Sequence, residues 1–285
     1  ALTSVTRRRL LSLLPDATPD AFEIELWLTQ AAADLADVVN RGHREAAPRS
    51  NDTSFAAVSL PFSPLEDVVY RLEHYLNSAP YRADVPIGRD IKIMGAREGS
   101  EVVVTVAVPV LARMVESRSE YDAVIERVRI DALALVRDGF GNGTTVRINQ
   151  ADTVDSQYLS LTGTSAEAGD DGQVGRGNRY RGLITPYRPM SLEATAGKNP
   201  AAHVGKTYHA FAEEISHRVM DETDVNETTI RMLSSIGRPV TEPQNVHVET
   251  VGSVDAAVVE VMVKESLADW EGVRDRLIAG AYELY

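Results

Sequence analysis

Residues 90–108, DIKIMGAREGSEVVVTVAV, are the part of the sequence that best indicates the fold class. Two runs with repeated β-branched residues, 90–94 and 101–108, flank a polar segment that contains Gly99. Such runs on either side of a glycine-containing turn are typical of an antiparallel hairpin. A protein that mixes hairpins with helices, without regular alternation of strand and helix, is α+β. We therefore predict an α+β fold.

Amphipathic helices are predicted on both sides of this hairpin. Ser63 can cap a helix whose first position is Pro64, and an apolar stripe follows at helical spacing. A second, longer helix contains Tyr121 and ends near Gly139. Further helices are predicted at 4–14, 31–40, from about 201 to 215 and at 267–278, and further strands at 22–28, 145–149, 158–162, 229–233 and 246–251.

The chain is acidic and has no cysteine. Its 285 residues include 29 Lys and Arg against 42 Asp and Glu, a net charge of −13. This charge repels nucleic acid and anionic membranes unless a local basic patch reverses the field. The lack of cysteine excludes disulfides, thiolate metal sites and thiol nucleophiles. Because no apolar run is long enough to span a bilayer and no signal peptide is recognisable, we expect a cytoplasmic protein.

One segment, from Glu167 to His209, is an exception to the acidic character. It lies largely within residues 163–200, which show no sustained helical or strand period, and a loop of that length in a compact domain is usually functional or disordered. Its basic residues outnumber its acidic ones: Arg176, Arg179, Arg181, Arg188, Lys198 and Lys206 against Glu167, Asp170, Asp171 and Glu193. Positive charge within an acidic protein concentrates anions, so this segment is the candidate anion site.

The tetrapeptide Gly197-Lys198-Asn199-Pro200 predicts a helix N-terminus, with Asn199 as the cap and Pro200 in the first turn. The unpaired N–H groups and the dipole of such a turn favour a bound phosphate. His203 and Lys206 are three residues apart and share a helix face, so Lys198, His203 and Lys206 can converge on one polyphosphate. The alternative is a capped helix whose charges are only solvated.

The glycines and acidic residues indicate a ligand or metal site less strongly than the basic residues do. Gly169, Gly172, Gly175, Gly177 and Gly182 would let backbone N–H groups approach a ligand, but they match neither the dinucleotide fingerprint nor a Walker loop. Asp170 and Asp171 can hold magnesium or a substrate ammonium group, or can be solvated turn residues. Asp52 lies in a similar turn or cap, and Asp90 with Lys92 is by default a charge pair.

Several long motifs occur together in a known family. They are Asn51-Asp52-Thr53-Ser54-Phe55, Asp90-Ile91-Lys92, Met94-Gly95, Arg97-Glu98-Gly99, the run from Gly163 to Gly172, the run from Val174 to Arg179, the run from Gly182 to Ser191, Ala196-Gly197-Lys198-Asn199-Pro200 and His203-Val204-Gly205-Lys206. In this order, over essentially the whole chain, they resemble the archaeal-type methionine adenosyltransferases (S-adenosylmethionine synthetases).

The resemblance implies a fold of three related α+β units that interleave along the sequence, the first of them incomplete here. Residues 1–47 would be the remnant of the first unit, completed by the loop 166–200. Residues 85–165 would form the middle unit, and residues 50–80 with 201–285 the C-terminal unit. The resemblance also implies a homodimer, or a hetero-oligomer, with active sites at the subunit interface.

The resemblance further implies a reaction. Methionine sulfur attacks C5′ of the ATP ribose and expels tripolyphosphate, which is then hydrolysed to phosphate and diphosphate; Mg²⁺ is required, and K⁺ is used by many members. By motif match the catalytic residues that hold the polyphosphate are Arg176, Lys198, His203 and Lys206. The expected nucleotide-binding residues are Asp90, Lys92, Ser165, Asp171 and Asn199. Asp52 and Asp170 would orient methionine, and Asp170 would also bind metal.

Some features of the family are missing from this sequence. Its Gly-His-Pro-Asp motif, which supplies a histidine near the leaving oxygen and an aspartate for magnesium, does not occur. Ala56 stands where the family has glycine, and alanine excludes the left-handed backbone that glycine permits. We expect the missing residues to come from a longer gene product or from a partner chain. There are two alternatives to a methionine adenosyltransferase. The chain could be a non-catalytic nucleotide-binding or regulatory subunit of a complete synthetase, or a specialised-metabolism paralogue that uses a methionine analogue.

Overall fold

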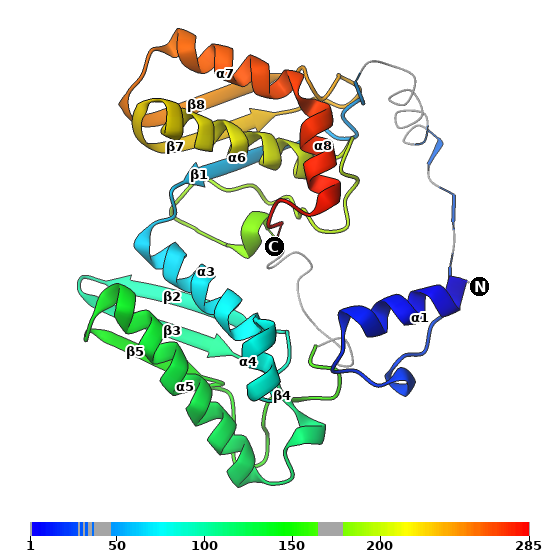
Figure 1. Ribbon diagram of the computed structural model, residues 1–285, viewed down its shortest axis with the longest axis vertical. Helices are drawn as coiled ribbons and strands as arrows, with labels where there is room; N and C mark the ends of the chain where they lie inside the picture. Colours follow the sequence, from blue (N-terminus) through cyan, green and yellow to red (C-terminus); the bar gives the residue numbers. More distant parts are fainter. Residues whose placement is uncertain are drawn as a thin grey trace. The chain divides into compact units, whose positions relative to one another are not determined.

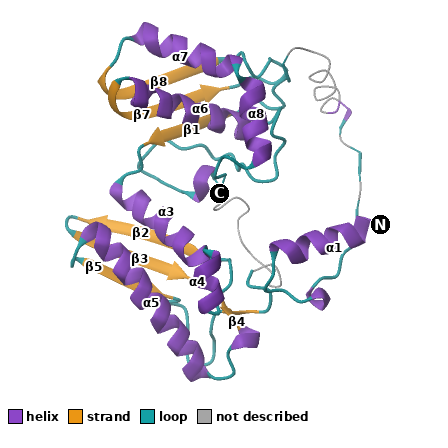
Figure 2. Ribbon diagram, viewed as in Figure 1, coloured by secondary structure: helices purple, strands orange, loops and turns teal. Residues whose placement is uncertain are grey.

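The computed structural model of the chain describes residues 2–27, 29–30, 32–33, 36, 47–164 and 179–284. The chain forms two compact units, here called unit 1 (Ala1–Leu28 with Ser63–Gly172) and unit 2 (Thr29–Phe62 with Gln173–Tyr285). Helices pack on β-sheets in both units, as Figures 1 and 2 show, which confirms the α+β prediction.

Unit 1 is built on a three-stranded sheet in the order β2-β3-β5. β2 (Lys92–Glu98) and β3 (Glu101–Ala107) form the predicted antiparallel hairpin, and Gly99 at its turn has a φ of 59°. Glycine adopts this left-handed conformation without a steric penalty. β5 (Thr144–Ile148) runs parallel to β3, and a parallel pair needs a long crossover, which α5 (Arg118–Phe140) supplies.

Helices cover one face of this sheet (Figure 1). α3 (Pro64–Asn77) begins with a capping box between Ser63 and Glu66, as the Ser63-Pro64 pair predicted, and α4 (Ala79–Asp84) follows it. Alternate residues of a strand point to the same face. One face of β3 is therefore buried under α3 and α5, and the shared core contains Val68, Leu72, Leu76, Val102, Val104, Val106, Val128, Ala132 and Val136.

The other elements of unit 1 are short, apart from α1 (Leu2–Leu13). They are the 3₁₀ turns Pro19–Ala21 and Ala112–Met114 and the two-stranded parallel sheet of β4 (Val110–Leu111) and β6 (Leu159–Ser160). An ion pair of 3.3 Å between Asp16 and Arg82 joins the segment after α1 to α4.

The strand predicted at 22–28 is not formed by residues 22–27. They make no strand pairing, and Trp27 is 86% exposed. Alternating apolar residues form a strand only where a neighbouring strand supplies hydrogen bonds, and none of the described strands pairs with this segment. The helix predicted at 31–40 falls mostly outside the described residues.

Unit 2 contains an antiparallel sheet in the order β1-β7-β8, made of Phe55–Leu60, Asp224–Leu233 and Asn245–Ser253. The strands predicted at 229–233 and 246–251 form parts of β7 and β8. Ala56 lies in β1, is fully buried and pairs with Met232. The extended backbone of a strand suits alanine, so the change from glycine falls in a strand and not in a loop.

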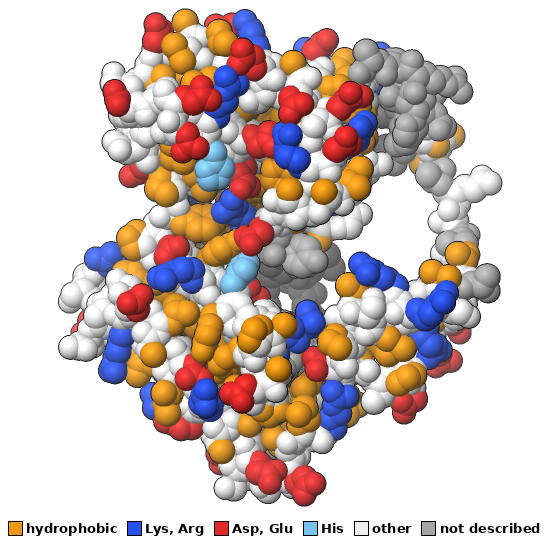
Figure 3. All heavy atoms as spheres, viewed as in Figure 1, with side chains coloured by type: hydrophobic (Ala, Val, Ile, Leu, Met, Phe, Trp, Pro, Cys, Tyr) orange, Lys and Arg blue, Asp and Glu red, His pale blue; other side chains and the backbone are white. Residues whose placement is uncertain are grey.

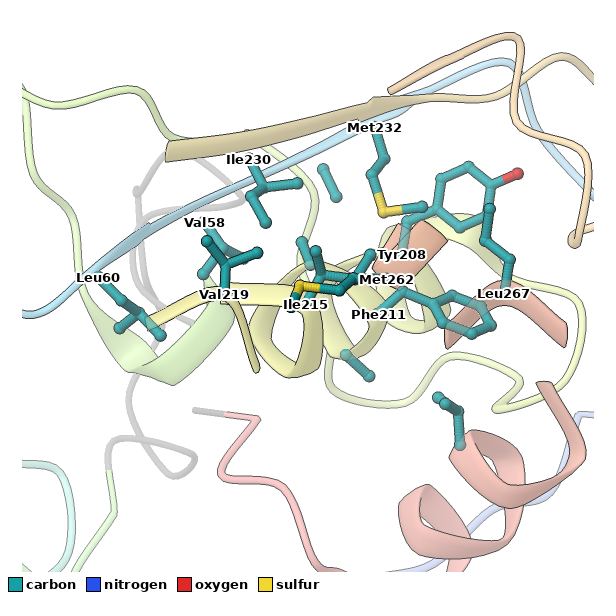
Figure 4. Close-up of a cluster of buried hydrophobic side chains, with 14 of the residues drawn as sticks. Val58, Leu60, Tyr208, Phe211, Ile215, Val219, Ile230, Met232, Met262 and Leu267 are labelled. Carbon is teal, nitrogen blue, oxygen red and sulfur yellow. The ribbon is translucent and has the colours of Figure 1, made fainter. Parts of the chain in front are cut away.

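Unit 2 also contains α6 (Val204–Glu222), α7 (Ala256–Ala268), α8 (Trp270–Ala279) and a 3₁₀ turn at Tyr180–Gly182. α6 packs on β1 and β7 and also contacts α7 and α8. Figure 4 shows side chains of α6 directed at the sheet, where they form a core with β1, β7 and α7 that includes Val58, Leu60, Tyr208, Phe211, Ile215, Val219, Ile230, Met232, Met262 and Leu267. The helix predicted at 267–278 corresponds to α8, whereas α7, which ends just before Asp269, was not predicted.

The expected grouping of residues 50–80 with 201–285 is wrong for α3. β1 pairs with β7 in unit 2, but α3 belongs to unit 1, because Leu72 and Leu76 are buried against the β2-β3-β5 sheet. The apolar stripe predicted the helix but not which of the two sheets it covers. The assignment of residues 1–47 and of the loop 166–200 to a common first unit stays a prediction.

Acidic side chains are dispersed over the helical face of unit 2, as Figure 3 shows. Several are paired with basic neighbours, such as Glu222 and Glu265 with Arg218 and Glu260 with Lys264. Among the helices of the described residues, none has the length and apolarity required to cross a membrane.

A matched pair of isoleucines tests the packing of unit 2. Ile215 on α6 is fully buried, whereas Ile278 on α8 is 67% exposed. Ile215→Ala removes core contacts and leaves a cavity, so we expect it to lower the free energy of unfolding by about 2–5 kcal/mol. Ile278→Ala is expected to change it by less than about 0.5 kcal/mol. Urea unfolding monitored by circular dichroism measures both, and equal effects would contradict the packing described here.

Candidate functional site

The predicted site residues lie in two groups, one in each unit. Asp90 and Lys92 belong to unit 1. The unit 2 group consists of Asp52, Lys198, Asn199, His203 and Lys206. The remaining predicted residues, Ser165, Asp170, Asp171 and Arg176, lie outside the described residues, so their roles stay predictions.

The start of α6 organises the group in unit 2. Asn199 caps a turn, because its Oδ1 accepts hydrogen bonds from the N–H groups of Ala201 (2.8 Å) and Ala202 (3.2 Å). The helix itself begins later, at Val204, where His203 Nδ1 accepts a bond of 3.2 Å from the N–H of Gly205. The prediction that Asn199 caps a helix with Pro200 in its first turn is therefore wrong: Asn199 caps only a turn, and the N-cap of α6 is His203.

His203 is neutral in this position. Burial, assisted by the positive charge of Lys198, lowers the pKa of His203 and outweighs the opposing effect of the carboxylates of Glu193 and Asp52. Since Nδ1 accepts from Gly205, the proton of the neutral ring is on Nε2. His203 is therefore a hydrogen-bond donor near neutral pH, available to an oxygen ligand at the start of α6.

Lys198 and Lys206 meet at the same helix end. The Nζ of Lys206 donates a bond of 2.6 Å to the carbonyl oxygen of Lys198, and Lys206 is only 8% exposed. Burial and the charge of Lys198 lower the pKa of Lys206, since both disfavour a second ammonium group. The prediction that Lys198, His203 and Lys206 lie together is confirmed.

Glu193 is part of this cluster, although the sequence indicated it only as one acidic residue of the loop. Its carboxylate is paired with the Lys198 ammonium group and accepts a bond of 2.7 Å from the hydroxyl of Ser54. Burial acts to raise the pKa of Glu193, but hydrogen bonds from Lys198 and Ser54, together with the charge of Lys198, make the net shift of this pKa downward. The carboxylate is therefore ionised and holds the Lys198 side chain in place.

Gly205 allows these groups to approach the helix backbone. A Cβ atom at this position would lie 2.8 Å from Oε2 of Glu193 and 3.1 Å from Nζ of Lys198. The first of these distances is shorter than side chains tolerate. Glycine thus lets the Glu193–Lys198 pair lie against the first turn of α6 without displacing the Glu193 carboxylate.

The segment around Asp52 is held beside the same helix end. The N–H of Asn51 donates to the carbonyl of Ala202 (3.1 Å), and the hydroxyl of Ser234 donates to the carbonyls of Asp52 (2.8 Å) and Ser54 (3.0 Å). Because the Asp52 charge also acts on His203, the carboxylate belongs to the neighbourhood of the cluster. The local pattern predicted only a turn here.

Two buried contacts fix residues 180–182 to α6. The ring of Tyr180 stacks on the imidazole of His209, with 5.0 Å between the ring centroids, and the guanidinium group of Arg181 pairs with the Glu213 carboxylate. Arg181 has a φ of 58°, a left-handed conformation that costs free energy in a residue other than glycine. Two contacts of the Arg181 guanidinium group stabilise this conformation. One is the pair with Glu213, and the other is the Phe62 ring, whose centroid lies 5.3 Å from Cζ of Arg181.

The group in unit 1 is centred on Asp90. Lys92 Nζ donates to Asp90 Oδ2 at 2.6 Å, and the hydroxyl of Tyr158 donates to the same oxygen at 2.5 Å. The charge pair expected by default is therefore present. Tyr158 was missed because it is 68 residues from Asp90, and no local pattern indicates so distant a contact.

The Asp90 segment also contacts the beginning of the predicted anion-binding loop. The N–H groups of Arg89 (2.6 Å) and Asp90 (3.2 Å) donate to the carbonyl of Gly163. A Cβ atom on Gly88 would lie 2.4 Å from the Cα of Gly163, so this backbone approach requires glycine at position 88. The contact connects two of the predicted motifs within unit 1.

A magnesium ion would need oxygen ligands. Within the part of the chain that the structure describes, no three His, Asp or Glu residues lie together as a metal cluster. Mg²⁺ bound with a nucleotide needs only one or two protein carboxylates, because phosphate oxygens and water fill the other positions. Asp52, whose charge acts on His203, is the described carboxylate that could serve such a site, and the metal role of Asp170 stays a prediction.

The buried imidazole of His209 predicts a pH dependence. Burial lowers the pKa of His209 from 6.5 to about 4, so between these pH values the unfolded chain binds a proton that the folded chain does not. Stability therefore falls as the pH falls from 6.5 towards 4. When the pH is lowered from 7 to 5, we expect the free energy of unfolding to fall by about 2 kcal/mol more in wild type than in His209→Gln, because each pKa unit corresponds to about 1.36 kcal/mol.

Urea unfolding at a series of pH values measures this difference. His247→Gln is the matched control, because the His247 side chain is 55% exposed on β8. Parallel pH profiles for wild type and His209→Gln would contradict the assignment of a buried, neutral imidazole.

The chain has relatives of known family. Residues 7–281 match the family described as S-adenosylmethionine synthetase (AdoMet synthetase). The S-adenosylmethionine synthases of Methanococcus aeolicus and Pyrobaculum aerophilum are 39% and 40% identical to the chain over 270 and 274 residues. Each alignment covers 92% of this chain but 66% and 67% of the respective relative. The chain thus spans about two thirds of the length of the curated relatives it matches.

A solved structure supports the fold. The structure of an unusual S-adenosylmethionine synthetase from Campylobacter jejuni matches with a TM-score of 0.57 at 17% sequence identity, over 90% of this chain and 65% of that chain. Identity this low is evidence for the fold alone, whereas the sequence relatives are archaeal synthases at about 40% identity over most of the chain. The chain therefore belongs to the S-adenosylmethionine synthetase family and is of the archaeal type.

Proposed function

We propose that the protein containing this chain is a methionine adenosyltransferase. It forms S-adenosylmethionine from ATP and methionine and releases tripolyphosphate, which is hydrolysed to phosphate and diphosphate. The His-Pro-Asp segment that the resemblance implies does not occur in this sequence, so the same polypeptide beyond this sequence or a partner chain supplies it. The assembly is a homodimer or a hetero-oligomer.

The observation that carries the proposal is the cluster at the start of α6. Two lysines and a neutral histidine whose Nε2 carries the proton lie at the start of the helix. The positive end of the helix dipole adds to their field. A polyphosphate chain is the ligand class that suits several converging donors of positive charge.

This arrangement suits the expulsion of tripolyphosphate. As the C5′–O bond breaks, negative charge develops on the leaving oxygen and is shared by the phosphates. Donors already in place stabilise that charge without reorganising. Lys198, His203 and Lys206 are assigned to this role, with Arg176 as a fourth donor. The methionine sulfur needs no general base, so the protein has only to align it opposite the leaving oxygen.

The other proposed site residues are assigned to binding the nucleoside, the methionine and the metal ion. Asp90 binds the ribose hydroxyls, and Lys92 lies beside the adenosine or its phosphates. Asp52 and Asp170 orient the methionine ammonium group. Mg²⁺, when bound with ATP, neutralises phosphate charge, and Asp52 and Asp170 are the carboxylates proposed to hold it. K⁺ is a further proposed cofactor.

The reaction is tested by mass spectrometry of a mixture of ATP, methionine and Mg²⁺ with the purified chain, alone and with its cognate partner. We expect S-adenosylmethionine from the complete assembly, together with phosphate and diphosphate. No product from any combination, while ATP still binds, would refute the catalytic role and favour a regulatory subunit.

Lysine variants test the polyphosphate site directly. Lys198→Met and Lys206→Met remove an ammonium group and keep an apolar stem of similar length. Because a charged hydrogen bond contributes about 1.5–3 kcal/mol, each variant is expected to weaken Mg²⁺-tripolyphosphate binding about tenfold or more, measured by isothermal titration calorimetry.

The matched control is Lys264→Met. Its ammonium group is on the exposed surface of α7 and pairs with Glu260. Thermal unfolding of each variant establishes that it is folded before binding is compared. Unchanged tripolyphosphate affinity in folded Lys198→Met and Lys206→Met would show that the cluster is not the polyphosphate site.

A further inference from the structure

We propose that Tyr158 is a positioning residue whose hydroxyl fixes the Asp90 carboxylate in the orientation that receives the ribose of ATP. The inference rests on the proposed function, because it concerns the nucleotide site. It assigns a role to a side chain that the motifs did not indicate.

Geometry is the first support. The Tyr158 hydroxyl and the Lys92 ammonium group both donate to Oδ2 of Asp90, at 2.5 and 2.6 Å. Two donors on one oxygen fix the rotation of the carboxylate about its Cβ–Cγ bond. The Lys92 side chain is 64% exposed and that of Asp90 is 20% exposed, so the flexible lysine alone provides a weak restraint. The rigid phenol ring provides a stronger one, because it has only two side-chain torsions.

The backbone of Tyr158 is itself held on both sides. Its N–H lies 3.1 Å from Oδ1 of Asp152 and 3.3 Å from the Tyr121 hydroxyl oxygen, and its carbonyl accepts from the N–H of Val110 at 2.9 Å. These bonds place the start of β6 beside β4. The backbone from which the Tyr158 side chain extends is therefore held in place by the fold of unit 1.

A buried polar network lies behind Tyr158. The Tyr121 hydroxyl donates to Asp152 Oδ2 (2.5 Å) and accepts from Asn149 Nδ2 (3.0 Å), and the Asn149 side chain bonds both the N–H and the carbonyl of Val108. Burial raises the pKa of Tyr121 to about 12, so its hydroxyl keeps its proton. Hydrogen bonds thus connect the end of the β2–β3 hairpin to the residue that holds Asp90.

The consequence is a site organised in advance of binding. A carboxylate already oriented towards the two ribose hydroxyls loses little rotational freedom when they bind. Without the tyrosine hydroxyl, Asp90 keeps its carboxylate but loses the more rigid of the two donors to Oδ2. Removal of the tyrosine hydroxyl should therefore weaken the binding of the ribose hydroxyls and leave the binding of the triphosphate unchanged.

The test compares Tyr158→Phe with wild type in the complete protein, using Mg²⁺-ATP and Mg²⁺-2′,3′-dideoxy-ATP as titrants in calorimetry. We expect ATP binding to weaken about 5- to 30-fold and dideoxy-ATP binding to stay within twofold, because the second ligand has no ribose hydroxyls for Asp90 to bind. In steady-state assays KM for ATP should rise while KM for methionine stays unchanged. Tyr75→Phe is the matched control: it removes the hydroxyl of a 40% exposed tyrosine in unit 1.

Further comparisons separate positioning from a general structural effect. In an Asp90→Asn background, Tyr158→Phe should weaken ATP binding by less than twofold, since the carboxylate it positions is gone. Unchanged ATP affinity in Tyr158→Phe, or an equal loss for ATP and dideoxy-ATP, would overturn the inference and leave the proposed function intact. If wild type itself binds neither nucleotide, the proposed function fails, and the inference fails with it.

Discussion

The structure depends above all on the buried first turn of α6. This helix packs on the β1-β7-β8 sheet through Tyr208, Phe211 and Ile215, and burying them places the positive end of the helix at a fixed point of unit 2. Lys206, almost fully buried, directs its ammonium group back to the Lys198 carbonyl. The same packing that stabilises unit 2 therefore concentrates positive charge at one helix end.

Glu193 shows how the protein stabilises this concentration of charge. Like charges at a buried site raise its energy, and the Glu193 carboxylate offsets this by pairing with Lys198 beside the first turn. A polyphosphate ligand would bring further negative charge to the same lysines. At the proposed polyphosphate site, affinity would therefore depend on the balance between the Glu193 carboxylate and the ligand, and not on the number of lysines alone.

Both groups of site residues share a design in which side chains of one motif are fixed by residues far away in the sequence. Ser54 holds Glu193 across 139 residues, and Tyr158 holds Asp90 across 68. Gly88 and Gly205 contribute by lacking a side chain, which allows a close approach to backbone or to charged groups. Such contacts orient functional groups before a ligand binds.

The fold class, the β2–β3 hairpin, the capped start of α3 and the Lys198–His203–Lys206 cluster could be predicted from the sequence alone, because each depends on residues close together in the chain. Contacts between distant segments were needed to show that α3 packs in unit 1, that residues 22–27 pair with no described strand, and that Glu193 and Tyr158 contact the predicted site residues. Helical and strand periods report which side of an element is apolar. They do not report which partner covers it, since that depends on contacts between distant segments.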